Sequence, residues 1–109
     1  MSEVQEIELS IEHANKLVAN KDMALKLSSN REFKKLITEG YFEKEAARLT
    51  ALLTDPNVSQ YKDDIITSLE GISSLQLYMR TIVQIGQAAE NEIAESRTML
   101  DDLLEEGNH

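Results

Sequence analysis

The sequence predicts an all-α protein, an antiparallel helical hairpin or coiled-coil stalk that carries a small helical head. Three observations support this fold class. The 109 residues include only four glycines and one proline, too few for the tight turns of an all-β fold. Charged residues make up 28% of the chain, as is typical of long helices. Hydrophobic residues recur at helical spacings along most of the chain.

The first predicted helix covers about residues 3–28 and forms one strand of the stalk. Its hydrophobic residues alternate at spacings of three and four, the pattern of a coiled-coil seam. Lys21 occupies one seam position, where a lysine lowers stability but can fix the register of two helices. The seam positions are Val4, Ile7, Ile11, Ala14, Val18, Lys21 and Leu25.

Residues 30–56 are predicted to form two short helices of the head. Ser29 and Glu32 have the spacing of a capping box and are expected to start the first of them. Gly40 is expected to end this helix in the left-handed conformation. The second helix follows at once and is expected to stop before Pro56, the only proline of the chain.

The longest periodic stretch, about residues 58–106, is predicted to be one helix with two apolar rows, each repeating every seven residues. A sustained heptad repeat predicts left-handed supercoiling around a partner helix. Further apolar residues lie off both rows between residues 65 and 85, so this part needs cover on two sides, which the helices of 30–56 are expected to provide. The rows are Ile65, Ile72, Met79, Gly86, Ile93 and Leu100, and Tyr61, Ser68, Leu75, Ile82, Ala89, Ser96 and Leu103. The residues off the rows are Ile66, Leu69, Leu77, Val83 and Ile85.

Helix lengths predict how these elements combine into one domain, residues 1–109. The first helix is about 38 Å long at 1.5 Å per residue, which matches the last part of the long helix, about 80–105. Antiparallel pairing of these two segments gives the stalk, and the head, about 30–75, closes one end of it. The pattern is compatible with pairing within one chain and with pairing between two chains.

The seams are the best candidate interaction surface. A two-helix hairpin buries little apolar surface, so we expect self-association or incorporation into a larger assembly. A hairpin that satisfies its seams internally is the alternative. The candidate seam residues are Ile7, Ile11, Val18, Leu25, Leu75, Met79, Ile82, Ala89, Ile93 and Leu100.

Four residues of the head are candidates for docking a partner. Tyr41 and Phe42 form an aromatic pair, which either is an exposed anchor or belongs to the core; we expect Phe42 to be buried and Tyr41 to be partly exposed. Lys44 and Arg48 are four residues apart and share a helix face. They either dock an acidic partner or pair with interleaved glutamates such as Glu45.

The residue inventory predicts a protein that is not an enzyme and that binds no cofactor or metal. The chain has no cysteine, which excludes disulfides, thiolate chemistry and cysteine-ligated zinc. It has no phosphate-binding loop and no nucleophile motif. His13 is expected to be an ordinary surface residue, and acidic pairs such as Asp101-Asp102 are expected to form a solvated face.

The net charge of −9 is unevenly distributed. Residues 81–109 carry seven acidic and one basic residue, a net charge of −6, whereas residues 31–54 carry four acidic and five basic residues, a net charge of +1. Acidic surfaces repel nucleic acid and anionic lipid, and no apolar run approaches the roughly 18 residues of a membrane span. We therefore expect protein partners, with no direct nucleic-acid or membrane binding, and a location in the cytoplasm of a host cell or in a virion built there.

Two runs of the sequence stand out, "REFKKLITEGYFEKEAARLTALLTDPN" and the later "LYMRTIVQIGQAAENEIAE". Through these runs the chain resembles, over residues 30 to about 95, small helical proteins encoded among tailed-phage genes, near those for virion assembly. It is a resemblance of pattern, a charged helix ending in EGYF, then EAARL, then a long helix. It implies a virion component or an assembly factor and carries over no functional residues.

These observations favour a non-enzymatic structural or interaction protein, a coiled-coil component or assembly factor of a larger complex such as a phage virion. The first alternative is an acidic antagonist that mimics nucleic acid and blocks a host DNA-binding protein. The second is a chaperone whose stalk clasps a client. The antagonist would use Glu90, Glu92, Glu95, Asp101 and Asp102, and the chaperone would use Met99, Leu103 and Leu104.

Overall fold

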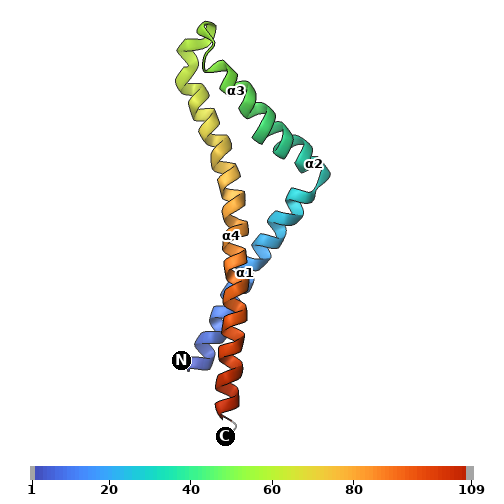
Figure 1. The fold of residues 1–109 in the computed structure, drawn as a ribbon, viewed down its shortest axis with the longest axis vertical. Helices are drawn as coiled ribbons and strands as arrows, with labels where there is room; N and C mark the ends of the chain where they lie inside the picture. Colours follow the sequence, from blue (N-terminus) through green and yellow to red (C-terminus); the bar gives the residue numbers. More distant parts are fainter. Residues whose placement is uncertain (1, 108–109) are drawn as a thin grey trace. The chain divides into compact units, whose positions relative to one another are not determined.

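A computed structural model describes residues 2–107, and these residues contain helices and no strand (Figure 1). The predicted all-α fold class is therefore confirmed. In chain order the helices are α1 (Glu3–Ser29), α2 (Arg31–Phe33), the π-helix η1 (Lys34–Glu45), α3 (Ala46–Leu52), the 3-10 helix η2 (Pro56–Tyr61) and α4 (Lys62–Gly107).

The chain divides into two compact units. The hairpin unit combines Met1–Ala24 with Thr81–His109, and the head unit is Leu25–Arg80.

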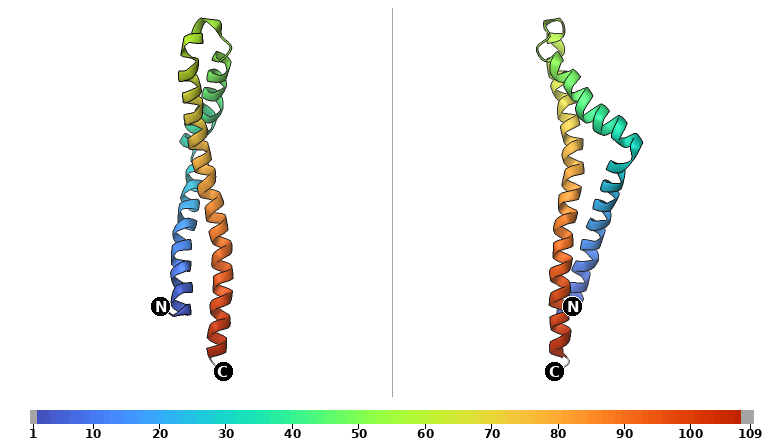
Figure 2. Two further views of the ribbon diagram at one scale, coloured as in Figure 1. Left: turned by 90° about the vertical axis from the view of Figure 1, so that its left-hand side faces the viewer. Right: turned by 45° about the vertical axis from the view of Figure 1, so that its right-hand side comes forward.

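In the hairpin unit, the first part of α1 lies beside the last part of α4, and the two run in opposite directions (Figure 2). Their contact centres on Ala14 of α1 and on Ala89 and Ile93 of α4, all of them buried. Two facing alanines let the helices approach closely, because interaxial distance depends on the side chains at the contact. Half-buried Ile11, Leu17 and Val18 pack around this centre. The predicted antiparallel hairpin is confirmed, and its seam pairs within one chain.

The junction between α1 and α2 differs from the predicted capping box. Ser29 is the last residue of α1, and its hydroxyl donates to the carbonyl oxygen of Leu25 at 2.9 Å. Asn30 is extended, and its side-chain oxygen accepts a hydrogen bond from the backbone N–H of Phe33 at 2.8 Å. Asn30 is therefore the N-cap, because the Ser29 hydroxyl is already bonded to the preceding helix.

The predicted break at Gly40 is wrong. The elements α2, η1 and α3 follow one another without interruption, and no described glycine has a positive φ. A Cβ at position 40 would lie 3.1 Å from the carbonyl oxygen of Lys35. A glycine here relieves crowding inside a π-helical turn, whose hydrogen bonds run between residues five apart, and it does not terminate a helix.

The core of the head unit consists of Leu49 from α3 and of Ile65 and Ile72 from α4. Seven half-buried hydrophobic residues pack against these three side chains. One face of the end of η1 and of α3 therefore rests on the first turns of α4 (Figure 2). These seven are Tyr41, Phe42, Ala46, Leu52, Leu53, Val58 and Leu69.

The turn into α4 follows the predicted stop before Pro56. Asp55 is extended, and its carboxylate accepts a hydrogen bond from the backbone N–H of Asn57 at 2.9 Å. Pro56 begins a 3-10 helix in which Val58 has non-helical angles, φ −123° and ψ 20°. The α-helix therefore starts at Lys62, later than the predicted residue 58.

Candidate interaction surfaces

The predicted seam residues fall into a group that is buried or half-buried and a group that is exposed. Along α1, the seam positions from Val4 to Lys21 are buried or half-buried, and the next seam residue, Leu25, is exposed. Leu75 of α4, in the head unit, is also exposed. The other seam candidates are buried (Ile7, Ala89, Ile93) or half-buried (Ile11, Val18, Met79, Ile82, Leu100).

Lys21 of α1 packs against Gly86 of α4 in the hairpin unit. Lys21 is only 8% exposed. A Cβ on Gly86 would collide with the Cβ of Lys21 and would lie 2.9 Å from its Cγ and 3.0 Å from its Cδ. The aliphatic part of Lys21 therefore packs directly on the bare backbone of α4, which explains how a lysine fits a seam position.

The ammonium group of Lys21 is neutralised at the edge of this contact. Its Nζ donates a hydrogen bond to Oε1 of Glu90, with which it forms an ion pair, and it lies 4.0 Å from Oδ1 of Asp22. Sequence reasoning identified Lys21 as a seam residue and named Glu90 only as a residue of the acidic antagonist, so it missed their ion pair. The spacing could have revealed it, because Gly86 and Glu90 are four residues apart and therefore share a face of α4.

The Lys21–Glu90 pair is expected to respond asymmetrically to substitution. Glu90→Ala leaves a buried ammonium without its main acceptor and should lower the free energy of unfolding by about 1–2 kcal/mol. Lys21→Met keeps the packing and leaves a solvated glutamate, so it should change stability by less than about 0.5 kcal/mol or raise it. Urea unfolding followed by circular dichroism measures both. Equal losses in the two variants would contradict this description of the pair.

The first turns of α4 are covered on one side only. The end of η1 and the helix α3 cover the side that carries Ile65 and Ile72. Ile66 is 36% exposed and Leu77 is 58% exposed, and with half-buried Leu69 they line a shallow groove of about 460 Å³. We call these three residues the outer row. The expectation that the head helices cover both sides is wrong, because neighbouring residues such as 65 and 66 point about 100° apart and one packed helix reaches only one of them.

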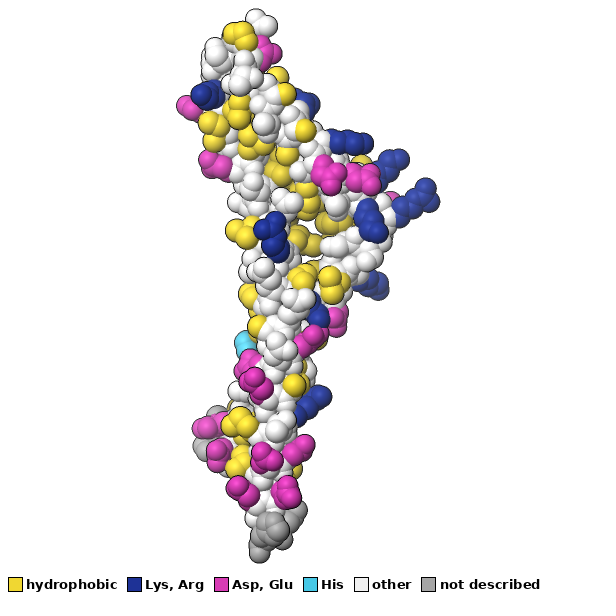
Figure 3. All heavy atoms as spheres, viewed as in Figure 1, with side chains coloured by type: hydrophobic (Ala, Val, Ile, Leu, Met, Phe, Trp, Pro, Cys, Tyr) yellow, Lys and Arg dark blue, Asp and Glu magenta, His cyan; other side chains and the backbone are white. Residues whose placement is uncertain are grey.

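A second concave surface, the head cleft, has a volume of about 650 Å³ and lies within the head unit. Its apolar part is formed by Phe33, Phe42 and Met79, all half-buried. Figure 3 shows hydrophobic side chains in the hollow beside η1 and several basic side chains around this hollow. The charged residues that line the cleft are Lys34, Glu39, Glu43, Lys44 and Arg80.

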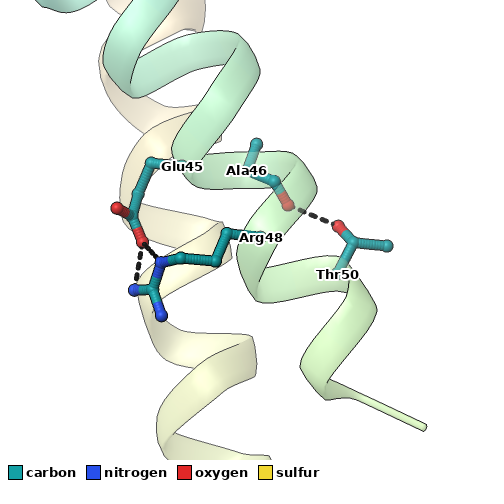
Figure 4. Close-up of polar contacts among 4 residues, drawn as sticks. All are labelled: Glu45, Ala46, Arg48 and Thr50. Carbon is teal, nitrogen blue, oxygen red and sulfur yellow. Dashed lines mark hydrogen bonds and ion pairs between the residues drawn. The ribbon is translucent and has the colours of Figure 1, made fainter.

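The four docking candidates of the head have different environments. Tyr41 and Phe42 are both half-buried, with ring centroids 6.0 Å apart; Phe42 is less buried than expected because it lines the cleft. Lys44 is exposed at the cleft, whereas Arg48 is held within its own helix. Nε of Arg48 donates to Oε1 of Glu45 at 2.9 Å, and its Nη2 donates to the same oxygen (Figure 4). Intrahelical pairing is therefore what the structure shows for Arg48.

Thr50, on the same turns, uses its hydroxyl locally. Its Oγ1 donates to the carbonyl oxygen of Ala46 at 2.7 Å (Figure 4). It presents no free donor toward a partner.

Residues 2–107 contain no group of three or more His, Cys, Asp or Glu side chains placed to hold a metal ion. His13 is exposed on α1. None of the helices within this range combines the length and the apolar character needed to cross a membrane.

Comparisons of the chain with protein-family models, with curated proteins and with solved structures found no match. The candidate surfaces are therefore defined by the contacts, burial and charge of the chain's own residues.

Proposed function

We propose that this protein is a non-enzymatic structural or interaction protein that associates with further copies of itself. It would serve as a coiled-coil component or assembly factor of a larger complex such as a phage virion, built in the cytoplasm of a host cell. The observation that carries the proposal is the outer row of α4, in which Ile66 and Leu77 are exposed and Leu69 is half-buried.

The outer row has the spacing of a helix-packing seam. With Ser73 between Leu69 and Leu77, the positions 66, 69, 73 and 77 are three or four residues apart, and all four residues line the same groove. Single exposed hydrophobic residues are normal on a protein surface, but an ordered row is typical of an interface. A second copy of α4 offers the same row at the same spacing, so two copies can bury it against each other in an isologous contact.

The small size of the core also supports the proposal. Among residues 2–107, eight hydrophobic residues are buried and thirteen large hydrophobic side chains are exposed. Burying a leucine or isoleucine contributes about 1.5–3 kcal/mol, so association adds stability that the single chain lacks. The resemblance to phage-encoded helical proteins supports the virion as the setting.

An aspartate at position 77 tests the proposed surface. Leu77→Asp removes the most exposed member of the outer row and places a charge in the groove. It should weaken self-association at least tenfold, which corresponds to about 1.4 kcal/mol. Sedimentation equilibrium measures the dissociation constant, and circular dichroism checks that helicity is retained.

The matched control is Gln87→Asp, which adds the same charge at an exposed position of the same helix. It should leave self-association within about twofold of the unsubstituted chain. If the two variants associate equally well, the outer row is not the contact surface.

The distribution of charge favours one alternative, an acidic antagonist of a host DNA-binding protein. The hairpin unit carries twelve acidic and three basic residues, a net charge of −9, whereas the head unit carries eight of each. A uniformly acidic surface can imitate nucleic acid. This alternative predicts binding to a basic protein that weakens steeply with salt, whereas contact through the outer row depends little on salt.

A further inference from the structure

We infer that the head cleft is a docking site for the acidic C-terminal turns of α4 from a second copy of this chain. The inference rests on the proposed function and adds to it a head-to-tail contact, separate from the outer row.

The π-helix supplies one side of the head cleft. Hydrogen bonds between residues five apart widen the helix, so side chains four or five residues apart share one face. Phe33, Thr38 and Phe42 follow this spacing, and all three line the cleft. An α-helix would turn these residues progressively away from one another, because its period is 3.6 residues. The unusual helix geometry therefore coincides with the concave surface.

The rim of the cleft offers basic groups. Lys34 and Lys44 of η1 and Arg80 of α4 are exposed. Among residues 2–107, no carboxylate lies within 4.0 Å of these three groups. Glu39 and Glu43 also line the cleft, so its net charge is +1. An apolar floor with a basic rim fits a ligand that is both apolar and acidic.

The last turns of α4 have this chemistry. Residues 95–107 carry five acidic residues and one arginine, a net charge of −4. Met99 and Leu104 are exposed beside them, and Leu103 is half-buried. The four acidic side chains of the final turns, at 101, 102, 105 and 106, are all exposed. This helical segment can place a hydrophobic side chain on Phe33, Phe42 or Met79 while its carboxylates face the basic rim.

The docked segment must come from another copy. Met79 and Asp101 belong to the same uninterrupted helix, which runs from Lys62 to Gly107. The segment cannot fold back into the cleft of its own chain while α4 is intact. A contact between two different surfaces is heterologous. It closes into a ring, of which a reciprocal pair of two copies is the smallest, or it builds an open filament.

The test uses two variants, of which one keeps only the acidic tail and the other keeps only the basic head cleft. Both are prepared in the Leu77→Asp chain so that the outer row no longer contributes to association. The head variant adds Lys44→Glu and Arg80→Glu. The tail variant adds Asp101→Asn, Asp102→Asn, Glu105→Gln and Glu106→Gln. All substituted side chains are exposed, and circular dichroism checks the helicity of every chain. Light scattering measures the mass of each chain alone and of an equimolar mixture.

We expect Leu77→Asp alone to form dimers or larger species, and to dissociate as salt is raised. Each variant alone should be monomeric, because it lacks a head or a tail. The mixture should form a 1:1 dimer and stop there, with a dissociation constant at least tenfold lower than that of either variant alone.

The inference is overturned if the mixture stays monomeric, or if either variant associates alone as strongly as Leu77→Asp. If the unsubstituted chain associates while Leu77→Asp is monomeric, the head-to-tail contact is absent and the proposed function stands. An unsubstituted chain that is monomeric at every concentration overturns both.

Discussion

Replacing Ile93 with aspartate should unfold the hairpin unit. Ile93 is 8% exposed and packs with Ala14 and Ala89 where α1 meets α4. The substitution removes a buried aliphatic side chain and places a carboxylate between two helices. We expect the free energy of unfolding to fall by about 4 kcal/mol or more, with a loss of helicity at 25 °C. Urea unfolding followed by circular dichroism measures the change.

Ile85→Asp is the matched control for Ile93→Asp. Ile85 lies on the same helix but is 45% exposed, so the new carboxylate stays in water. Its effect on the free energy of unfolding should be within about 1 kcal/mol. Similar losses in both variants would show that the hairpin does not pair through the face that carries Ile93.

A single methyl group at position 86 should also destabilise the hairpin unit strongly. The added Cβ of Gly86→Ala would collide with the Cβ of Lys21. Rotation of a side chain cannot relieve this clash, since the backbones fix both Cβ atoms. The helices must separate, and the contact between Ala14 and Ala89 loosens with them. We expect a loss of about 3 kcal/mol, even though alanine is favoured over glycine by about 1 kcal/mol within a helix.

Gly71→Ala, on the same helix, should instead stabilise the protein. The nearest atom to a Cβ at position 71 is the hydroxyl oxygen of Tyr41, at 4.0 Å, so the methyl group makes an ordinary van der Waals contact and no clash. Helix propensity then acts alone, and the free energy of unfolding should rise by about 1 kcal/mol. Thermal unfolding compares the two variants directly. Stabilisation by both substitutions would contradict the close approach of Lys21 to α4.

The sequence predicts the parts of this fold that depend on local periodicity. The helices of the hairpin were predictable from the seam between Val4 and Leu25 and from the heptad rows after residue 61. A hydrophobic repeat of three and four residues that continues over many turns indicates a helix. Pro56 marks the turn between α3 and α4, since proline removes a backbone donor and fixes φ.

Features that depend on competition between neighbouring groups were not predictable in the same way. Ser29 and Asn30 are both good N-cap residues, and the choice of Asn30 depends on the bond between Ser29 and Leu25. Gly40 suits a helix end as well as a crowded π-helical turn, and only the tertiary fold distinguishes the two. The sequence has twenty acidic residues, and only the structure shows that Glu90 is the one that pairs with Lys21.

The candidate interaction surfaces show the same division. The surplus of apolar residues between 65 and 85 indicated that α4 needs cover on two sides, which is a property of the pattern. The pattern did not show that one packed helix leaves Ile66 and Leu77 uncovered, because that depends on where the helix rests. The head cleft combines Phe33 and Phe42 with Met79 from a distant part of the sequence, so no local motif predicts it.

The most direct measurement of self-association is the solution mass of the unsubstituted chain, determined by light scattering after size exclusion over a concentration series. One chain has a mass of 12.3 kDa. We expect the measured mass to exceed this value and to rise with concentration, because the outer row is buried only when copies meet. A mass that stays at 12.3 kDa across the whole series would contradict self-association.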